Sequence, residues 1–157
     1  MRALKLVQHM NMNAVRMSEG LLDKIRKSER CADLLRKVSL EEQKRANLET
    51  YRDLTNWLSD GTDSTMQDRY VARGILRAGQ GVPFSNMYWA VCIAHEHLWE
   101  YMQEECLIEE PVEFWGGVML LRSLTRFFER ATYYTLIGYE KAASGALYEV
   151  SPVLSQR

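Results

Sequence analysis

The side chains best suited to chemistry in this chain are the two histidines of the segment AHEHLW, His95 and His97. Each residue of an α-helix is rotated by about 100° from the one before it, so these two side chains point about 200° apart. A zinc-binding helix of the His-Glu-x-x-His type places its histidines four positions apart, on one face. The observed spacing therefore predicts that this pair binds no metal ion.

Haem is a separate question, because its iron needs only one axial histidine in an apolar pocket. His97 has Ile93 and Tyr101 beside it on the same helical face and is the better candidate ligand. The alternative is that both histidines are ordinary half-buried helix residues, with His97, Tyr101 and Trp99 lining a small ligand pocket. We favour this alternative and expect no cofactor. A haem or gas sensor that uses His97 would instead show a Soret absorption band.

Composition excludes several classes of protein. The 157 residues carry 20 Lys+Arg and 21 Asp+Glu, interspersed along the chain, so the net charge of −1 offers no basic surface for nucleic acid. No apolar run is long enough to cross a bilayer. The three cysteines are scattered and form no Cys-x-x-Cys pair, which is typical of a reducing cytoplasm. No nucleophile–base or phosphate-binding motif occurs, so we expect a cytoplasmic protein without enzymatic activity.

The elements that must position these residues are helices. Apolar residues recur every three or four positions along most of the chain, which predicts an all-α antiparallel bundle of five to six helices. The expected helices cover about residues 4–25, a short piece within 27–35, and then 40–58, 64–79, 83–106 and 111–141. We expect residues 1–143 to form one domain and residues 144–157, with Gly145 and Pro152, to be a loose tail or linker.

Local motifs predict several helix ends. Ser39 and Glu42 form a capping box, in which the Ser39 hydroxyl accepts from the Glu42 backbone N–H and the Glu42 carboxylate reaches back. Gly61 can end that helix in a left-handed cap. Gly79 or Gly81 can end the following helix, and Pro83 then lies in the first turn of the next helix, where a missing N–H is tolerated. We expect Gly81-Val82-Pro83 to fix this reversal, with Gly81 in the left-handed conformation.

The last long helix is apolar over most of its circumference. One face alone would serve a small core, so a second apolar face predicts either a subunit interface or a central position within the chain. We favour a homodimer whose interface consists of Leu120, Leu124, Phe127, Ala131 and Tyr134. On the same helix, Gly138 allows close approach of another backbone.

The segment RGILRAGQGVPFSNMYWAVCIAHEHLWEYM, residues 73–102, resembles the core signature of the RsbRD N-terminal domain family, the N-terminal modules of RsbT co-antagonist-type regulators. The segments NWLSDG at 56–61 and GYEKAA at 138–143 resemble the ends of that family's helices. The matching residues within the long segment are Arg73, Arg77, Gly81, Val82, Pro83, Ser85, His97, Leu98 and Trp99.

This resemblance implies a cytoplasmic sensory or regulatory domain in signal transduction and stress response, without catalysis. Related stressosome sensor domains are globin-like, lack haem and dimerise, so it also implies a globin-like arrangement. Such domains bind a protein partner or precede an output module, and they can take a small ligand. Since 157 residues leave no room for an output module, we expect either an excised N-terminal part of a larger protein or a regulator that acts in trans.

Overall fold

The structure, a computed structural model, describes the backbone of residues 2–60, 64–105 and 114–155 and the side chains of residues 4–59, 65–105 and 118–145. Over this part of the chain it contains helices and no strands, which confirms the predicted all-α fold class. The helices are α1 (Arg2–Arg26), the 3-10 helix η1 (Glu29–Cys31), α2 (Ala32–Lys37), α3 (Leu40–Asp60), α4 (Ser64–Gly79), α5 (Phe84–Glu104) and α6 (Phe114–Ser155).

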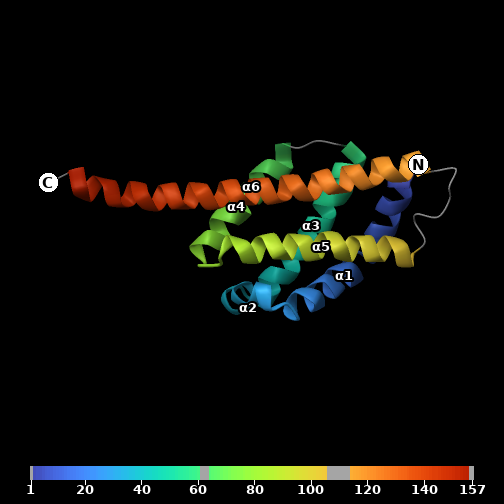
Figure 1. The fold of residues 1–157 in the computed structure, drawn as a ribbon, viewed down its shortest axis with the longest axis horizontal. Coiled ribbons are helices and arrows are strands. Elements are labelled where there is room, and N and C mark those ends of the chain that lie inside the picture. The colour runs from blue at the N-terminus through green and yellow to red at the C-terminus, as the bar shows by residue number, and fades with distance from the viewer. Residues whose placement is uncertain (1, 61–63, 106–113, 156–157) are drawn as a thin grey trace.

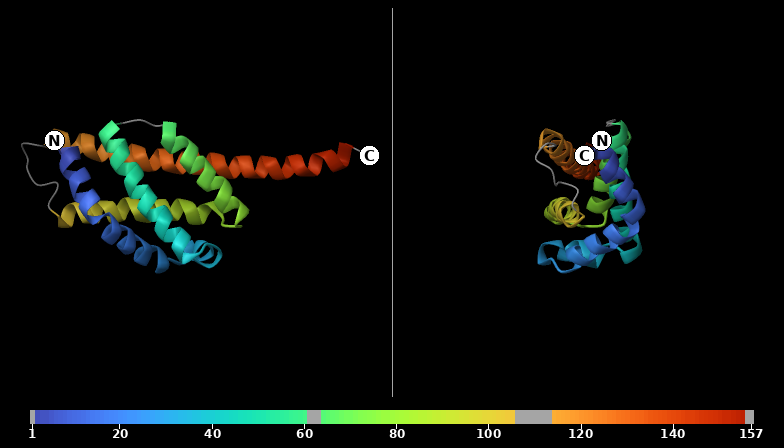
Figure 2. Two further views of the ribbon diagram at one scale, coloured as in Figure 1. Left: turned by 180° about the vertical axis from the view of Figure 1, so that it is seen from behind. Right: turned by 90° about the vertical axis from the view of Figure 1, so that its right-hand side faces the viewer.

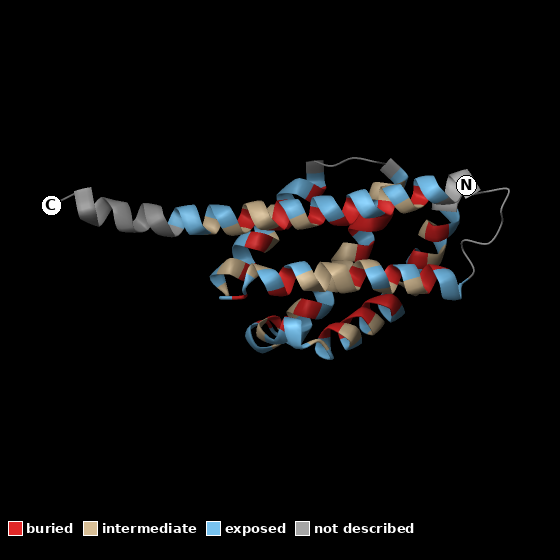
Figure 3. Ribbon diagram, in the orientation of Figure 1, coloured by how far each residue is buried: buried red, intermediate tan, exposed pale blue. Residues whose placement is uncertain are grey.

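The helices pack in crossed pairs (Figures 1 and 2). Helices α5 and α6 run antiparallel along the long axis of the molecule, and α3 and α4 form a second antiparallel pair that crosses them. The most extensive packing joins α4 to α6 and α1 to α3, while α5 contacts α6, α1 and α2. Buried residues lie on the facing sides of these helices (Figure 3). None of the helices in the described part of the chain is long and apolar enough to cross a membrane.

The predicted capping box at the start of α3 forms only in part. The Glu42 backbone N–H donates to the Ser39 hydroxyl at 3.2 Å, as expected. The Glu42 carboxylate does not return to Ser39 but accepts from Arg77 of α4 at 2.9 Å and from the Gln80 side chain. A charged partner on another helix has replaced the local one. Gly61, the predicted cap at the other end of α3, lies outside the described residues.

The reversal between α4 and α5 depends on Gly81, which has a φ of 77° as predicted. The Gly81 N–H donates to the Ala78 carbonyl and the Val82 N–H to the Arg77 carbonyl, which together form a Schellman motif. Two side chains from distant helices also bind this turn. The Lys37 ammonium donates to the Gly81 carbonyl at 2.7 Å, and the Tyr139 hydroxyl donates to the Val82 carbonyl at 2.7 Å.

Helices α4 and α6 touch backbone to backbone through two glycines. A Cβ atom on Gly74 would lie 2.2 Å from the Thr135 carbonyl oxygen, and one on Gly138 would lie 2.3 Å from the Val71 carbonyl oxygen. Neither distance is possible between real atoms, so only glycine permits this crossing. Gly74 therefore has a packing role in the middle of α4. The close approach expected at Gly138 is confirmed.

Helix α6 is the central helix of the fold, which makes the predicted dimer surface wrong. Each residue of that surface is less than a tenth exposed in the single chain: Leu120, Leu124, Phe127, Ala131 and Tyr134. They are buried because α3, α4 and α5 all pack on α6.

The expectation of a loose tail after residue 143 is wrong for residues 144–155, whereas the domain boundary and the linker alternative stay predictions. The α6 backbone stays helical through Gly145 and Pro152 to Ser155, so residues 144–155 are not a loose tail. The backbone stays helical here although, relative to alanine, a glycine costs a helix about 1 kcal/mol and a proline about 3 kcal/mol. The final part of α6 extends past the other helices (Figure 1).

Replacing Gly81 by valine should lower the free energy of unfolding by about 1–2 kcal/mol or more, because a β-branched side chain is strained at positive φ. Thermal or urea denaturation measures this change. An unchanged midpoint would mean that the left-handed turn is absent from the protein in solution.

Replacing Gly74 by alanine should destabilise the protein by about 1–3 kcal/mol or more, because the new methyl group meets the Thr135 carbonyl and must push α4 away from α6. Gly79→Ala is the matched control on the same helix, since a Cβ there meets nothing within 4 Å. It should leave stability unchanged or raise it slightly. Equal effects of the two substitutions in chemical denaturation would contradict the backbone contact.

Candidate functional site

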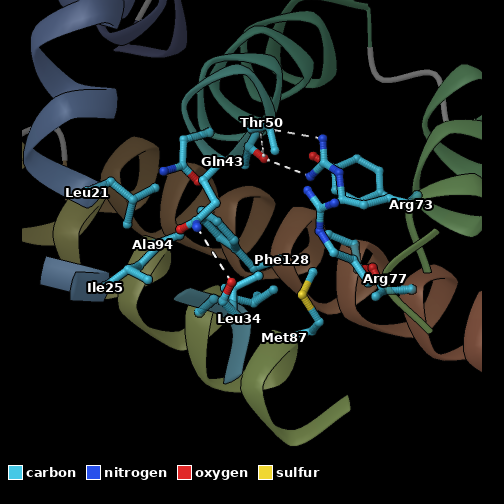
Figure 4. A pocket seen from close by; sticks show the side chains of 17 residues that line it. Leu21, Ile25, Leu34, Gln43, Thr50, Arg73, Arg77, Met87, Ala94 and Phe128 are labelled. Atoms are coloured by element: carbon cyan, nitrogen blue, oxygen red, sulfur yellow. Dashed lines mark hydrogen bonds between the residues drawn. The ribbon is translucent and has the colours of Figure 1, made fainter. Parts of the chain in front are cut away.

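A small pocket of ≈ 70 Å³ lies at the centre of the fold, and all six α-helices contribute to its walls (Figure 4). Its apolar wall comes from α1, α2, α5 and α6 and consists of Leu21, Ile25, Leu34, Met87, Ala90, Val91, Ala94, Phe128 and Ala131. Its polar wall comes mainly from α3 and α4 and consists of Gln43, Asn47, Thr50, Tyr70, Arg73 and Arg77, with Ala46 and Thr135 completing the lining. The pocket is therefore amphipathic, with one polar side facing an apolar one.

The polar wall is held by a ladder of ion pairs between α3 and α4. Arg69, Arg73 and Arg77 are spaced four residues apart and so lie on one face of α4. They pair in turn with acids of α3, in the pairs Arg69–Asp53, Arg73–Glu49 at 3.3 Å and Arg77–Glu42 at 2.9 Å. Burial increases along the series, because the side chain of Arg69 is 43% exposed and those of Arg73 and Arg77 are 12% and 3% exposed.

Several polar atoms of this wall have no partner. Gln43 Oε1, Asn47 Nδ2 and Arg77 Nε are fully buried and form no hydrogen bond within the protein. A buried polar group left in this state costs about 1–3 kcal/mol. All three side chains line the pocket. The atoms themselves have almost no accessible surface in the pocket as it stands, so a bound molecule can satisfy them only if the side chains around them shift.

The orientation of Gln43 follows from its surroundings. Its Nε2 group donates to the Val38 carbonyl at 2.8 Å and to the Leu34 carbonyl at 3.5 Å. Two acceptors on this side assign the nitrogen to it. The side-chain oxygen is therefore the free group, and Gln43 offers the pocket an acceptor, whereas Asn47 Nδ2 and Arg77 Nε offer donors.

Ionisation in the ladder is set by burial and by the arginines. Burial alone would raise the pKa of Glu42, but hydrogen bonds from Arg77 and Gln80 outweigh it and lower the pKa, so this carboxylate stays charged. Burial raises the pKa of Asp53 even though Arg69 and Arg73 lie beside it. Burial also raises the pKa of Tyr70 to about 12, so the polar wall carries a neutral phenol.

The two histidines of the AHEHLW segment point to different helices. The His95 ring stacks on Phe128 of α6 with ring centroids 4.7 Å apart. The His97 Nε2 atom lies 3.1 Å from the Met17 carbonyl oxygen of α1. Within the residues that the structure describes, no three His, Cys, Asp or Glu side chains come together in a way that could hold a metal ion.

The pocket predicted around His97 exists only in part. His97 and Tyr101 line a second cleft, which is distinct from the central pocket. It is open, has a volume of ≈ 420 Å³ and lies between α1 and α5. Trp99 is 39% exposed and does not line this cleft. The rest of the lining is largely charged: Arg16, Met17, Gly20, Lys24, Glu100, Glu104 and Glu105. Such a cleft suits a polar solvent channel better than an apolar cofactor.

The same geometry gives little support to His97 as a haem ligand. Its Nε2 atom, the one best placed at the end of the ring, is already used by the Met17 carbonyl. Gly20 lies directly against the ring, since a Cβ atom there would be 3.0 Å from His97 Cε1. An iron atom on Nε2 would have to displace α1.

Sequence reasoning missed most of the polar wall. Gln43, Asn47 and Thr50 gave no signal, because single amides and hydroxyls on a helix are common. Arg73 and Arg77 entered only as features of the family resemblance. The usable signal was the four-residue spacing of the arginines on α4 together with acids on one face of α3, which predicts an interhelical ion-pair ladder.

Comparison of the chain with models of known protein families, with curated proteins and with solved structures found no match. The resemblance to the RsbRD N-terminal domain family and the globin-like arrangement that it implies therefore stay predictions.

The stability of the protein should fall as the pH drops below 6.5, the ordinary pKa of histidine. Burial, together with the charge of Lys24, lowers the pKa of His97 in the folded protein. Between the folded and unfolded pKa values the unfolded chain binds more protons, so acidification favours unfolding. Protonation would also put a hydrogen on His97 Nδ1, which is buried without a partner.

The measurement is the thermal midpoint as a function of pH for the wild type and for His97→Gln, whose amide can still donate to the Met17 carbonyl. The variant should show a shallower decline. Burial also lowers the pKa of His95, so His95→Gln should remove a further part of the slope. Identical slopes in all three proteins would show that neither histidine is held neutral by the fold.

Proposed function

We propose that the chain is a non-catalytic input domain of signal transduction, in which a small molecule in the central pocket changes the packing of the helices and α6 passes the change to a protein partner. The observation that carries this proposal is the set of unpartnered polar atoms, Gln43 Oε1, Asn47 Nδ2 and Arg77 Nε, in a pocket that all six α-helices line. A ligand that satisfies these atoms would stabilise one arrangement of the six helices over others.

The connection from the pocket to α6 is short. Phe128, Ala131 and Thr135 of α6 line the pocket. One turn beyond them, Gly138 contacts Gly74 of α4 directly through the backbone. Backbone contact leaves no side chain to absorb a displacement, so a movement of α4 at the pocket must be followed by α6. Since α6 continues beyond the other helices, it can reach an output module in cis or a partner in trans (Figure 1).

The absence of catalysis is part of the proposal. The hydrogen bonds of the described residues give no nucleophile next to a base. The Cys31 thiol is buried and donates to the Asn86 carbonyl, and His97 meets a backbone carbonyl. Burial also raises the pKa of Cys31, which keeps the thiol protonated and unreactive.

Two further parts of the proposal concern the setting of the protein. We place it in the cytoplasm because its cysteines are scattered and unpaired in sequence. We also propose that it forms a homodimer, as the family resemblance implies. The residues first predicted for the interface belong to the core, so a dimer would use other surfaces. Light scattering at increasing protein concentration measures this association.

Filling the pocket with a side chain should imitate a bound ligand. Ala94 of α5 is 5% exposed and lines the pocket, so Ala94→Val places two methyl groups inside it. We expect slower amide hydrogen exchange in α3, α4 and the distal part of α6, measured by mass spectrometry on the full chain. Ala72→Val is the matched control, because Ala72 is an exposed helical alanine of α4 and carries the same cost of helix propensity.

Two results would contradict this relay. Slower exchange confined to α5 peptides around residue 94 would mean that the pocket does not communicate with α6. Faster exchange throughout the chain would mean that the pocket has no room for an occupant, and it would remove the basis of the proposal.

A further inference from the structure

We infer that the central pocket binds a short-chain carboxylate of about two or three carbons, with the carboxylate on the α3–α4 side and the alkyl group against α5 and α6. This inference rests on the proposed ligand-binding role of the pocket and names the chemical class of its ligand. Three observations carry it: the sign of the charge in the pocket, the type of the unpartnered atoms and the size of the apolar side.

The charge that faces the pocket is positive. Arg73 and Arg77 line it, and no aspartate or glutamate is among the described residues that do so. Their partners Glu49 and Glu42 lie on the outer side of the ladder, where their side chains are 40% and 21% exposed. The ion pairs therefore keep the arginines in place, and both side chains lie at the wall of the pocket (Figure 4). The charged groups that line the pocket are therefore guanidinium donors, which suit an anionic acceptor better than a cation.

The unpartnered donors match a carboxylate. The Nη1 atom of Arg77 bonds to Glu42 and Gln80, but its Nε atom has no acceptor although the side chain is only 3% exposed. Asn47 Nδ2 is a second donor without an acceptor. A carboxylate presents two oxygen acceptors and forms strong charge-assisted bonds with guanidinium groups. Gln43 Oε1 then receives a water molecule that enters with the ligand, because a carboxylate has no proton to donate.

The apolar side limits the length of the ligand. Met87, Val91 and Phe128 line the pocket and provide an apolar surface for methyl or methylene groups. The volume of ≈ 70 Å³ is about half that of an engineered cavity of about 150 Å³ that accommodates benzene. Acetate and propionate fit this limit, whereas longer fatty acids do not.

The test compares acetate with acetamide, which has nearly the same shape and no charge. The full chain is titrated with each at constant ionic strength, with chloride as the reference anion, and the thermal midpoint is recorded. We expect acetate and propionate to raise the midpoint and to bind at least about tenfold more tightly than their amides, as the loss of a charge-assisted bond implies. Butyrate and hexanoate should give progressively smaller shifts.

Variants locate the binding site. Arg77→Lys keeps the positive charge and a donor for Glu42 but removes the Nε group, and it should weaken acetate binding by about tenfold. Arg69→Lys is the matched control on the same face of α4, because Arg69 pairs with Asp53 and does not line the pocket. It should leave acetate binding unchanged. If Arg77→Lys fails to fold, Asn47→Leu removes the second donor and should have the same effect on acetate.

Three outcomes would overturn the carboxylate assignment. Equal stabilisation by acetate and acetamide would mean that the pocket takes a neutral ligand, and the proposed function would stand without this ligand class. A shift that survives both Arg77→Lys and Asn47→Leu would place the anion elsewhere on the surface. No shift with any of these compounds would mean that the pocket holds only water, and the hydrogen-exchange comparison of Ala94→Val would then decide separately whether the pocket communicates with α6.

Discussion

The contact between Gly74 and Gly138 is the constraint on which the rest of this structure depends. Because no side chain separates α4 from α6 at this point, the crossing of the two helices is fixed by backbone atoms. That crossing sets how far α4 lies from the apolar wall and therefore how deeply Arg73 and Arg77 enter the core. The volume of the pocket therefore depends on the absence of a Cβ atom at Gly74 and at Gly138.

The ion-pair ladder between α3 and α4 compensates for the burial of the arginine charges of α4. The Arg77 guanidinium is only 3% exposed and needs a carboxylate nearby. Glu42 provides this carboxylate, and for that reason it does not complete the capping box. The start of α3, the end of α4 and the polar wall thus share one charged residue. Removing either partner would leave the other charge buried and unpaired, which is more costly than replacing both with apolar residues.

Features of the fold that depend on neighbouring residues could be predicted from the sequence. The left-handed Gly81, the Ser39 cap and the inward stripe of α5 through Ala94 and Leu98 all follow from local patterns. The apolar circumference of α6 was also read correctly, but local patterns cannot say whether the second face meets another helix or another chain. The packing role of Gly74 could not be predicted for the same reason, because it depends on Gly138, which lies 64 positions further along the sequence. The pocket-lining roles of Gln43 and Asn47 could not be predicted either, because an amide without a hydrogen-bond partner is recognised only once its surroundings are known.

The turn between α4 and α5 has a consequence for the order in which the chain acquires its structure. Its backbone geometry is local and can form early, within a stretch of six residues. Two of its carbonyl groups, those of Gly81 and Val82, accept from Lys37 and Tyr139, which are 44 and 57 residues away in sequence. Closing such long loops is entropically expensive and comes late on a folding pathway. The hydrogen bonds from Lys37 and Tyr139 can therefore form only once α2 and α6 lie against this turn.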